Sequence, residues 1–348
     1  MTTRQCPDTE GHRRRRSDFS PPPAQAAHPC GTNAGDDAGT ELPGATRRSR
    51  AHRKSLSTFA AARSTGTKRM AESACRQGTP MGSSAVMLTR TELLALHDQQ
   101  VRGTIASRLP GSWRPSWDGP VLQVATPARG FAFAQDLDGL TVEELDALIG
   151  RVRNRSAARG QAVEWKTYGH DRRDLPARLQ LAGFAPEDEE TVVIGLAADL
   201  IASGEAPDGI TVRATTDLTD LRRIAAMESE VWGADWSWLA DDLHDRICSA
   251  AENIVVLVAE AAGEVVSAAW LVILPGTQFA ALWGGSTLRQ WRGKGIYRTL
   301  VARRAQIATD RGITYLLVDA STDSRPILQR LGLHPVTTTT PWVWSPTT

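Results

Sequence analysis

The sequence has few of the features that mark several large classes of protein. It contains four cysteines in 348 residues, and three of them precede residue 80, so no disulfide framework or zinc-ligand spacing is present. No apolar run approaches the roughly 20 residues that a membrane-spanning helix needs, and no hydrophobic signal core is found near the start. We therefore expect a metal-free protein of the reducing cytoplasm that does not associate with membranes.

The chain also has little net charge, but its charged residues are unevenly distributed along the sequence. The formal net charge is +1, and residues 1–84 carry fourteen Lys/Arg against seven Asp/Glu, which leaves a net charge of −6 on the remainder. A mildly acidic remainder argues against a broad nucleic-acid-binding surface. With 41% hydrophobic residues, the length fits about two globular domains.

Residues 1–88 have the composition of a disordered basic tail. They are rich in Arg, Ser, Thr, Gly, Pro and Ala, include the run Arg13–Arg16, and lack a periodic apolar face. A transit peptide or a nucleic-acid-binding arm shares this Arg-rich, acid-poor character. We favour a solvated extension, or a reading frame that starts upstream of the true initiator at Met70, Met81 or Met87.

From residue 89 onward, apolar periodicity and turn signals predict a first structured unit, residues 89–201. Its longest helix is expected to begin at Thr141, with Glu144 three residues later completing a capping box, and to end at Gly160. A stretch rich in Ser, Gly, Glu, Pro and Asp at 202–209 is the predicted linker. The other predicted elements are a helix from 89, a turn at 113–120, strands at 121–125, 130–134, 162–168 and 191–196, and a helix at 174–182.

Residues 210–348 form the second predicted unit, with the element order β-α-α-β-β-β-α-β-α-β. Its first helix is expected to be capped by Asp217, and its first hairpin to turn at Gly263. The strands are predicted at 210–214, 253–262, 264–274, 278–283, 315–320 and 336–344. The helices are predicted at 218–231, 296–310 and 324–331, with one more helix that follows the Trp-rich stretch and ends at 247.

The stretch from Gln290 to Tyr297 carries the most specific chemical signal. Gly293 and Gly295 lie between a predicted strand and a long predicted helix, where backbone N–H groups and the positive end of the helix dipole can bind a phosphate. Because no G-x-x-x-x-G-K-[ST] motif is present, a P-loop nucleotide-binding protein is a poor alternative. The preceding pair Gly284-Gly285 is expected to introduce a bulge that opens a wedge beside the strand.

A faint internal repeat links the two units. The segment 179–186 aligns with 328–335 and is identical at Leu, Gln, Gly and Pro, and each copy follows a strand and precedes a final β-rich segment. The two units are therefore predicted to be related halves.

With these motifs in place, the second unit resembles the GNAT superfamily of N-acetyltransferases. Gln290, Gly293 and Gly295 match its Q/R-x-x-G-x-G/A signature, in the required position between strand and helix. The resemblance implies a mixed, mostly antiparallel twisted sheet flanked by helices, in two related halves, and acetyl-CoA as co-substrate. It also implies that the pantetheine arm and pyrophosphate are bound by Thr287, Leu288, Arg289, Arg292, Gly293, Lys294, Gly295, Ile296, Tyr297 and Ser321.

Three positions depart from the family pattern. Leu328 stands where many members have the Tyr that acts as general acid, and Ser321 stands where an Asn is usual. The strand at 278–283 has no carboxylate, where some members place a general base. The catalytic candidates are therefore Glu230 and Asp319 as base, chosen over Glu228 and Asp235, with Tyr297 and Ser324 as substitute acids and oxyanion donors near Leu288.

The expected partner is a small-molecule or peptide amine, and the protein is expected to be a monomer or homodimer. Trp232, Trp236, Trp238 and Trp283 are candidates for an acceptor pocket, although core packing competes with that role. The first half lacks the glycine signature, so we expect it to bind no cofactor and to wall the acceptor site, with His170 in a turn or at the contact between halves. The alternative function is a non-catalytic acyl-CoA-binding sensor or interaction module.

Overall fold

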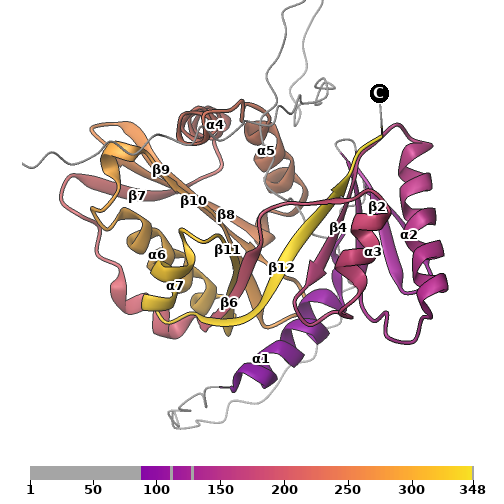
Figure 1. Cartoon of the computed structure of the whole chain (residues 1–348). Helices are drawn as coiled ribbons and strands as arrows, with labels where there is room; N and C mark the ends of the chain where they lie inside the picture. The colour runs from indigo at the N-terminus through magenta and orange to yellow at the C-terminus, as the bar shows by residue number, and fades with distance from the viewer. Residues whose placement is uncertain (1–87, 110–112, 127–128, 347–348) are drawn as a thin grey trace, which may run out of the picture. The chain divides into compact units, whose positions relative to one another are not determined.

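The computed structural model describes residues 88–109, 113–126 and 129–346. They form a mixed α/β fold in which helices flank a mostly antiparallel sheet, as predicted (Figure 1). The predicted disordered tail lies outside the described residues, apart from Leu88. Within the described ranges, no helix has both the length and the apolar character needed to cross a bilayer.

The first half begins at a capping box in which the Thr89 hydroxyl accepts from the Glu92 N–H. Its longest helix, α2, begins at a second capping box, formed by Thr141 and Glu144 as predicted. The elements are α1 (Arg90–His97), η1 (Asp98–Arg102), η2 (Ile105–Arg108), β1 (Arg114–Asp118), β2 (Val121–Ala125), β3 (Gly130–Ala134), α2 (Val142–Ala157), β4 (Val163–Tyr168), α3 (Leu175–Leu181), β5 (Ala185–Pro186), β6 (Glu190–Leu196) and η3 (Ala198–Ser203).

The predicted turn at 113–120 was wrong, because β1 lies within it. β1 pairs antiparallel with β2 and is the first strand of the sheet order, so its other edge has no neighbour in the described sheet. Pro115 is tolerated there because an edge strand does not need every N–H group for pairing. Proline and tryptophan suggested a turn in a segment that is an edge strand.

The second half has the element order that the sequence predicts. The Asp217 side chain accepts from the N–H groups of Thr219 and Asp220 at the start of its first helix, which confirms the predicted cap. The elements are β7 (Ile210–Thr215), α4 (Leu218–Trp232), α5 (Trp238–Ala250), η4 (Ala251–Asn253), β8 (Ile254–Ala261), β9 (Glu264–Ile273), β10 (Phe279–Thr287), η5 (Arg289–Trp291), α6 (Ile296–Asp310), β11 (Tyr315–Ala320), α7 (Arg325–Arg330) and β12 (His334–Trp344).

Two apolar layers cover the faces of the second half's strands (Figure 1). Leu221 and Leu243, from α4 and α5, pack with Leu317 of β11 on one face. Leu328 of α7 and Val301 of α6 pack with neighbouring β-strand residues on the other face. The alternation of side chains along each strand thus separates an α4–α5 face from an α6–α7 face.

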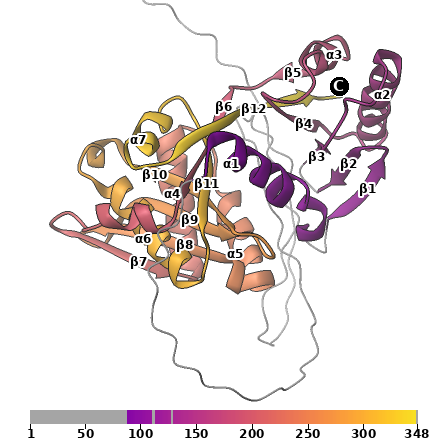
Figure 2. The ribbon, with the colours of Figure 1, turned by 90° about the horizontal axis from the view of Figure 1, so that it is seen from below.

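The sheet order shows that the two halves exchange their last strands (Figure 2). The order is β1-β2-β3-β4-β12-β6-β11-β10-β9-β8-β7. In each half, an antiparallel hairpin leads to a parallel pair, β3 with β4 or β10 with β11. β4 then pairs with β12 of the second half, and β11 pairs with β6 of the first. The sheet is therefore continuous across the predicted linker at 202–209.

The internal repeat appears as two matching helix ends. α3 and α7 both end at a glycine with positive φ, +88° at Gly183 and +105° at Gly332. The next residue donates its N–H back to the buried leucine five positions earlier, at 3.0 Å in the first half and 3.1 Å in the second. Both ends have the hydrogen bond expected of a Schellman-type C-cap, so the weak sequence repeat corresponds to the same local structure.

Candidate acyl-CoA site

An opening in the sheet lies between β10 and β11. The two strands pair in parallel only from Phe279–Ala281 to Tyr315–Leu317, although β10 continues to Thr287. Beyond this point the register of β10 with β9 shifts at Gly284, where φ is +66°, and Gly285 follows with φ +86°. The bulge predicted from the two glycines is confirmed, and it lies where β10 leaves its parallel neighbour.

Aromatic rings pack tightly against both glycines of this bulge. A Cβ atom at Gly284 would lie 2.5 Å from the Trp270 ring, and one at Gly285 would lie 2.6 Å from Cε2 of Tyr297. Burial raises the pKa of Tyr297, so its phenol stays protonated at neutral pH. Tyr297 therefore packs against the opening as an uncharged group, a geometry compatible with either predicted role, acid or cofactor contact.

A buried cation that sequence reasoning missed lies beneath the bulge. Arg304 of α6 is 1% exposed, and its Nη1 donates to the carbonyl oxygens of Trp283 at 3.1 Å and Trp270 at 3.4 Å. Burial lowers its pKa to about 10, which leaves the guanidinium charged at neutral pH. The spacing of Leu300, Arg304 and Ala308 places the arginine on the apolar stripe of its helix, and this was the available sequence signal.

The loop after β10 has the form of an anion cradle. Gly293 and Gly295 have φ values of +76° and +88°, and Gly295 is the N-cap of α6 without a side-chain cap. The first N–H groups of a helix have no partner within the helix, and the dipole adds positive potential there. Because the first turn of α6 has no acidic residue, nothing in that turn opposes a bound phosphate.

The two basic side chains of this loop contact nearby residues of the same segment. Nε of Arg292 donates to the Thr287 carbonyl at 3.0 Å, which joins the loop to the end of β10. The Lys294 ammonium lies 4.2 Å from the centre of the Trp291 ring. Both residues are exposed, so they add positive charge at the mouth of the cradle.

The backbone of Leu288 is already engaged, which limits the predicted oxyanion donors near Leu288 to neighbouring N–H groups. Its N–H donates to Val266 at 3.0 Å, and its carbonyl accepts from Trp291 at 2.9 Å. An N–H has one hydrogen to donate, so Leu288 is not an oxyanion donor. Gly285, the extra residue of the bulge, has no register partner on β9 and is the more suitable backbone position.

Ser321 and Ser324 lie together in the turn before α7. Their hydroxyl oxygens are 3.2 Å apart, and the Ser324 N–H points to the Ser321 hydroxyl at 3.4 Å. Leu328, at the position of the family's acid, is fully buried in the α6–α7 face. The two serines organise a helix start, and their predicted chemical roles remain predictions.

The two leading base candidates differ in environment. Glu230 is exposed on α4. Asp319, at the end of β11, lies 2.5 Å from the buried ammonium of Lys166. Lys166 therefore already binds one oxygen of the Asp319 carboxylate, and the role of either residue as base stays a prediction.

An aromatic cluster lies beside a buried carboxylate at the α4–α5 junction. The ring centres of Trp232 and Trp236 are 6.3 Å apart, and those of Trp236 and Trp238 are 5.3 Å apart. The indole N–H of Trp232 donates to Glu228, which is 2% exposed, at 2.7 Å. Trp232 itself is 44% exposed, so this cluster keeps an accessible aromatic surface.

The corresponding crevice of the first half has different chemistry. The start of α2 is closed by the Thr141–Glu144 capping box, and Glu143 adds another acidic side chain. A cavity of about 320 Å³ beside it is lined by Asp98, Asp136, Asp138 and Asp171 and by the cations Arg102 and Arg172. This helix start therefore opposes phosphate binding, whereas the start of α6 favours it.

His170, which lines the same cavity, joins three parts of the chain. Its Nδ1 lies 2.9 Å from the Thr337 hydroxyl on β12, and its Nε2 lies 2.9 Å from Asp98 in η1. This arrangement matches the predicted contact between halves. In the described ranges, no group of three or more His, Cys, Asp or Glu side chains is placed to hold a metal ion.

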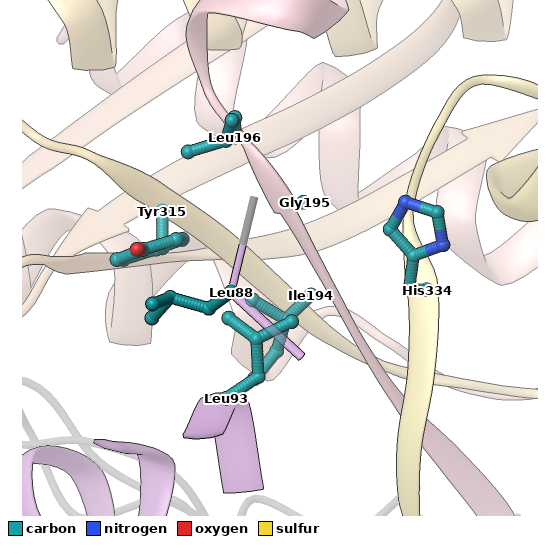
Figure 3. A pocket seen from close by; sticks show the side chains of 7 residues that line it. All are labelled: Leu88, Leu93, Ile194, Gly195, Leu196, Tyr315 and His334. Carbon is teal, nitrogen blue, oxygen red and sulfur yellow. The ribbon is translucent and has the colours of Figure 1, made fainter. Parts of the chain in front are cut away.

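A second cavity lies under the start of α1 and is too small to bind a substrate. Its volume is about 10 Å³, and apolar side chains including Leu88, Leu93 and Ile194 line it with Tyr315 and His334 (Figure 3). Leu93 belongs to the same apolar cluster as α4 and α5. α1 of the first half thus packs against the second half's α4–α5 face.

Comparison with known proteins agrees with this geometry. Residues 218–333 match the model of the acetyltransferase (GNAT) family. This part of the chain is a GNAT domain. No curated protein matches the sequence. The match includes the bulge, the glycine loop and α6, which together form the opening and the cradle.

Solved structures share the GNAT fold over a larger part of the chain. A GCN5-related N-acetyltransferase from Kribbella flavida has a TM-score of 0.56 at 17% identity, over 76% of this chain and 98% of that one. A tandem GNAT protein from the clavulanic acid biosynthesis pathway has a TM-score of 0.51 at 13% identity, over 71% and 87%. A GCN5-related N-acetyltransferase from Sphaerobacter thermophilus has a TM-score of 0.50 at 14% identity, over 74% and 94%. The shared fold therefore extends beyond residues 218–333.

Proposed function

We propose that the protein is an N-acetyltransferase that transfers the acetyl group of acetyl-CoA to a primary amine by direct attack in a ternary complex. The observation that carries this proposal is that the opening beside β10 leads without interruption to the glycine loop at the start of α6. The opening between β10 and β11 begins at the glycine bulge, and β10 leads directly to the two-glycine start of α6. An amide-containing arm fits beside a free strand edge, and a pyrophosphate fits the cradle.

Binding energy is expected to come from both ends of this path. The N–H groups of Gly293 to Tyr297 face the pyrophosphate, with Arg292 and Lys294 adding charge. Backbone groups of neighbouring residues in a strand point to opposite edges, so Thr287, the last residue of β10, pairs with the pantetheine arm, while Leu288 contacts it through packing alone. Arg289, at the start of η5, lies next to this edge. Ser321 lies across the opening, at the end of β11.

In the reaction, the neutral amine attacks the thioester carbonyl. The N–C bond forms, the C–S bond breaks, and the amine proton ends on the departing thiol. In this proposal the backbone N–H of Gly285 stabilises the oxyanion, and the neutral phenol of Tyr297 protonates the leaving sulfur. The Trp232–Trp238 cluster with Glu228 favours an aromatic or cationic amine as acceptor, because indole faces and a carboxylate both attract positive charge.

The competing function is a sensor that binds acyl-CoA without turnover. It is supported by the buried Leu328, which leaves the usual acid position without a proton donor. Thiol release from acetyl-CoA, measured over a panel of primary amines, separates the two functions. Release with at least one amine supports the transferase, whereas calorimetric binding of acetyl-CoA without release supports the sensor. Absence of acetyl-CoA binding would overturn both.

A further inference from the structure

Lys166 belongs to the first half of the chain but ends beside the acyl-CoA opening of the second. It lies on β4, its side chain is 2% exposed, and its Nζ is 2.5 Å from Oδ2 of Asp319 on β11. The exchanged strands β12 and β6 stand between β4 and β11 in the sheet order. The ion pair therefore links the two halves across their exchanged strands.

The ammonium of Lys166 remains charged in spite of its burial. Burial alone lowers the pKa of this lysine, but the negative charge of Asp319, with Tyr168 and Glu190 nearby, raises it above its ordinary value. Such a buried pair adds little stability compared with an apolar pair of equal size, whereas removal of one partner is costly. A contribution to folding stability therefore does not explain why these two buried residues are charged.

Asp319 lies where the opening begins. The parallel pairing of β10 and β11 ends at Leu317, two residues earlier, and alternate residues of a strand share a face. Asp319 is therefore on the same face as Leu317, which is the face covered by α4 and α5. Within the described residues, Lys166 binds one carboxylate oxygen of Asp319, and no hydrogen bond engages the other, Oδ1.

We propose that Lys166 is a positioning residue for acetyl transfer. By binding Oδ2, it fixes the Asp319 carboxylate so that Oδ1 accepts a hydrogen bond from the attacking amine. Holding the nucleophile beside the carbonyl is a large part of catalysis in a reaction between two bound molecules. This inference rests on the proposed transferase function, and it gives the first half a part in the reaction although acetyl-CoA binds in the second.

The test compares Lys166→Met, Lys166→Arg and the double variant Lys166→Met/Asp319→Asn in the full chain. Acetyl-CoA affinity is measured by calorimetry, and kcat and KM are measured with an amine that the wild type accepts. We expect Lys166→Met to bind acetyl-CoA within about twofold of wild type but to lose about tenfold or more in kcat. Lys166→Arg keeps the positive charge and is expected to recover part of this loss.

The double variant distinguishes positioning from a purely structural role. Without either charge, the chain has no unpaired buried ion, so its melting temperature is expected to exceed that of Lys166→Met. We expect its kcat to remain low. A double variant that is stable and fully active would overturn the inference, as would an unchanged kcat in Lys166→Met. Arg151→Met, which removes the cation of an exposed pair with Asp118, is the control. A wild type without acetyl-CoA binding or turnover would refute the proposed function instead.

Discussion

α2 and α6 occupy corresponding places in the two halves, since each connects the two strands of a parallel pair, β3 with β4 or β10 with β11. α6 begins at Gly295, without a side-chain cap or an acidic residue in its first turn. α2 begins at Thr141, whose hydroxyl accepts a hydrogen bond from the Glu144 N–H. The Glu144 carboxylate in turn accepts one from the Thr141 N–H. The same position in the fold therefore favours an anion in one half and opposes it in the other, and side chains at the N-cap and first turn make the difference.

The largest expected effect comes from placing a carboxylate in the cradle. Gly293→Asp points a charged side chain into open space where the pyrophosphate is proposed to lie. We expect acetyl-CoA affinity, measured by calorimetry, to fall by about 100-fold or more, since like charges meet at the helix start. Gly160→Asp is the matched control, with a similar φ of +63°, open space and no proposed phosphate. Equal loss in both variants would show that backbone strain causes the effect.

A smaller effect is expected when a methyl group is added at the bulge. The new Cβ of Gly285→Ala would lie 2.6 Å from the Tyr297 ring. Gly276→Ala imposes similar backbone strain, at φ +74°, but has no atom within 4 Å. We expect Gly285→Ala to lower the free energy of unfolding by about 2 kcal/mol more than this control, as measured by urea denaturation. Equal losses of unfolding free energy in the two variants would mean that the Tyr297 ring can move to accommodate the added methyl group.

Removal of the cap from the first half tests the other side of the comparison. Thr141→Ala deletes the hydroxyl that caps α2 and is expected to cost about 1 kcal/mol of folding stability. Wild type and variant should each bind one acetyl-CoA per chain, because glycines are still missing from this helix start. A stoichiometry near two in either protein would contradict the assignment of the cradle to α6 alone.

The smallest expected effect concerns the exposed charge at the mouth of the cradle. Lys294→Met should weaken acetyl-CoA binding by about threefold at low ionic strength, and the difference should shrink as salt is added. Arg303→Met removes an exposed charge from α6, the helix that follows the loop, and serves as control. A loss that does not depend on salt would point to the packing of Lys294 on Trp291 instead of its charge.

Local features of this fold were predictable from the sequence, and long-range ones were not. The Thr141 capping box, the Gly263 hairpin and the bulge at Gly284 depend on a few neighbouring residues, so sequence patterns indicated them correctly. The partner of β4 lies some 170 residues away, and no pattern within β4 specifies it. The Lys166–Asp319 pair depends on that pairing and could not have been predicted.

The site was predicted unevenly for the same reason. The glycine loop carries its own conformational signal, because positive φ at Gly293 and Gly295 is a backbone requirement. The engaged N–H of Leu288 depends on the register of β10 with β9, which a strand pattern does not fix. Arg304 was overlooked because an arginine in an apolar stripe is usually assigned to the surface.

The exchange of last strands also constrains the order in which the protein can be completed during synthesis. β4 emerges from the ribosome with β3 available as a neighbour, but its other edge is paired only by residues 339–344, which are made about 170 residues later. Until then, that edge is a free template for another strand, an exposure associated with aggregation of partly made chains. The charged side chains of Glu164 and Lys166 on β4, which are buried in the complete fold, would disfavour pairing with a strand of another chain until β12 is made.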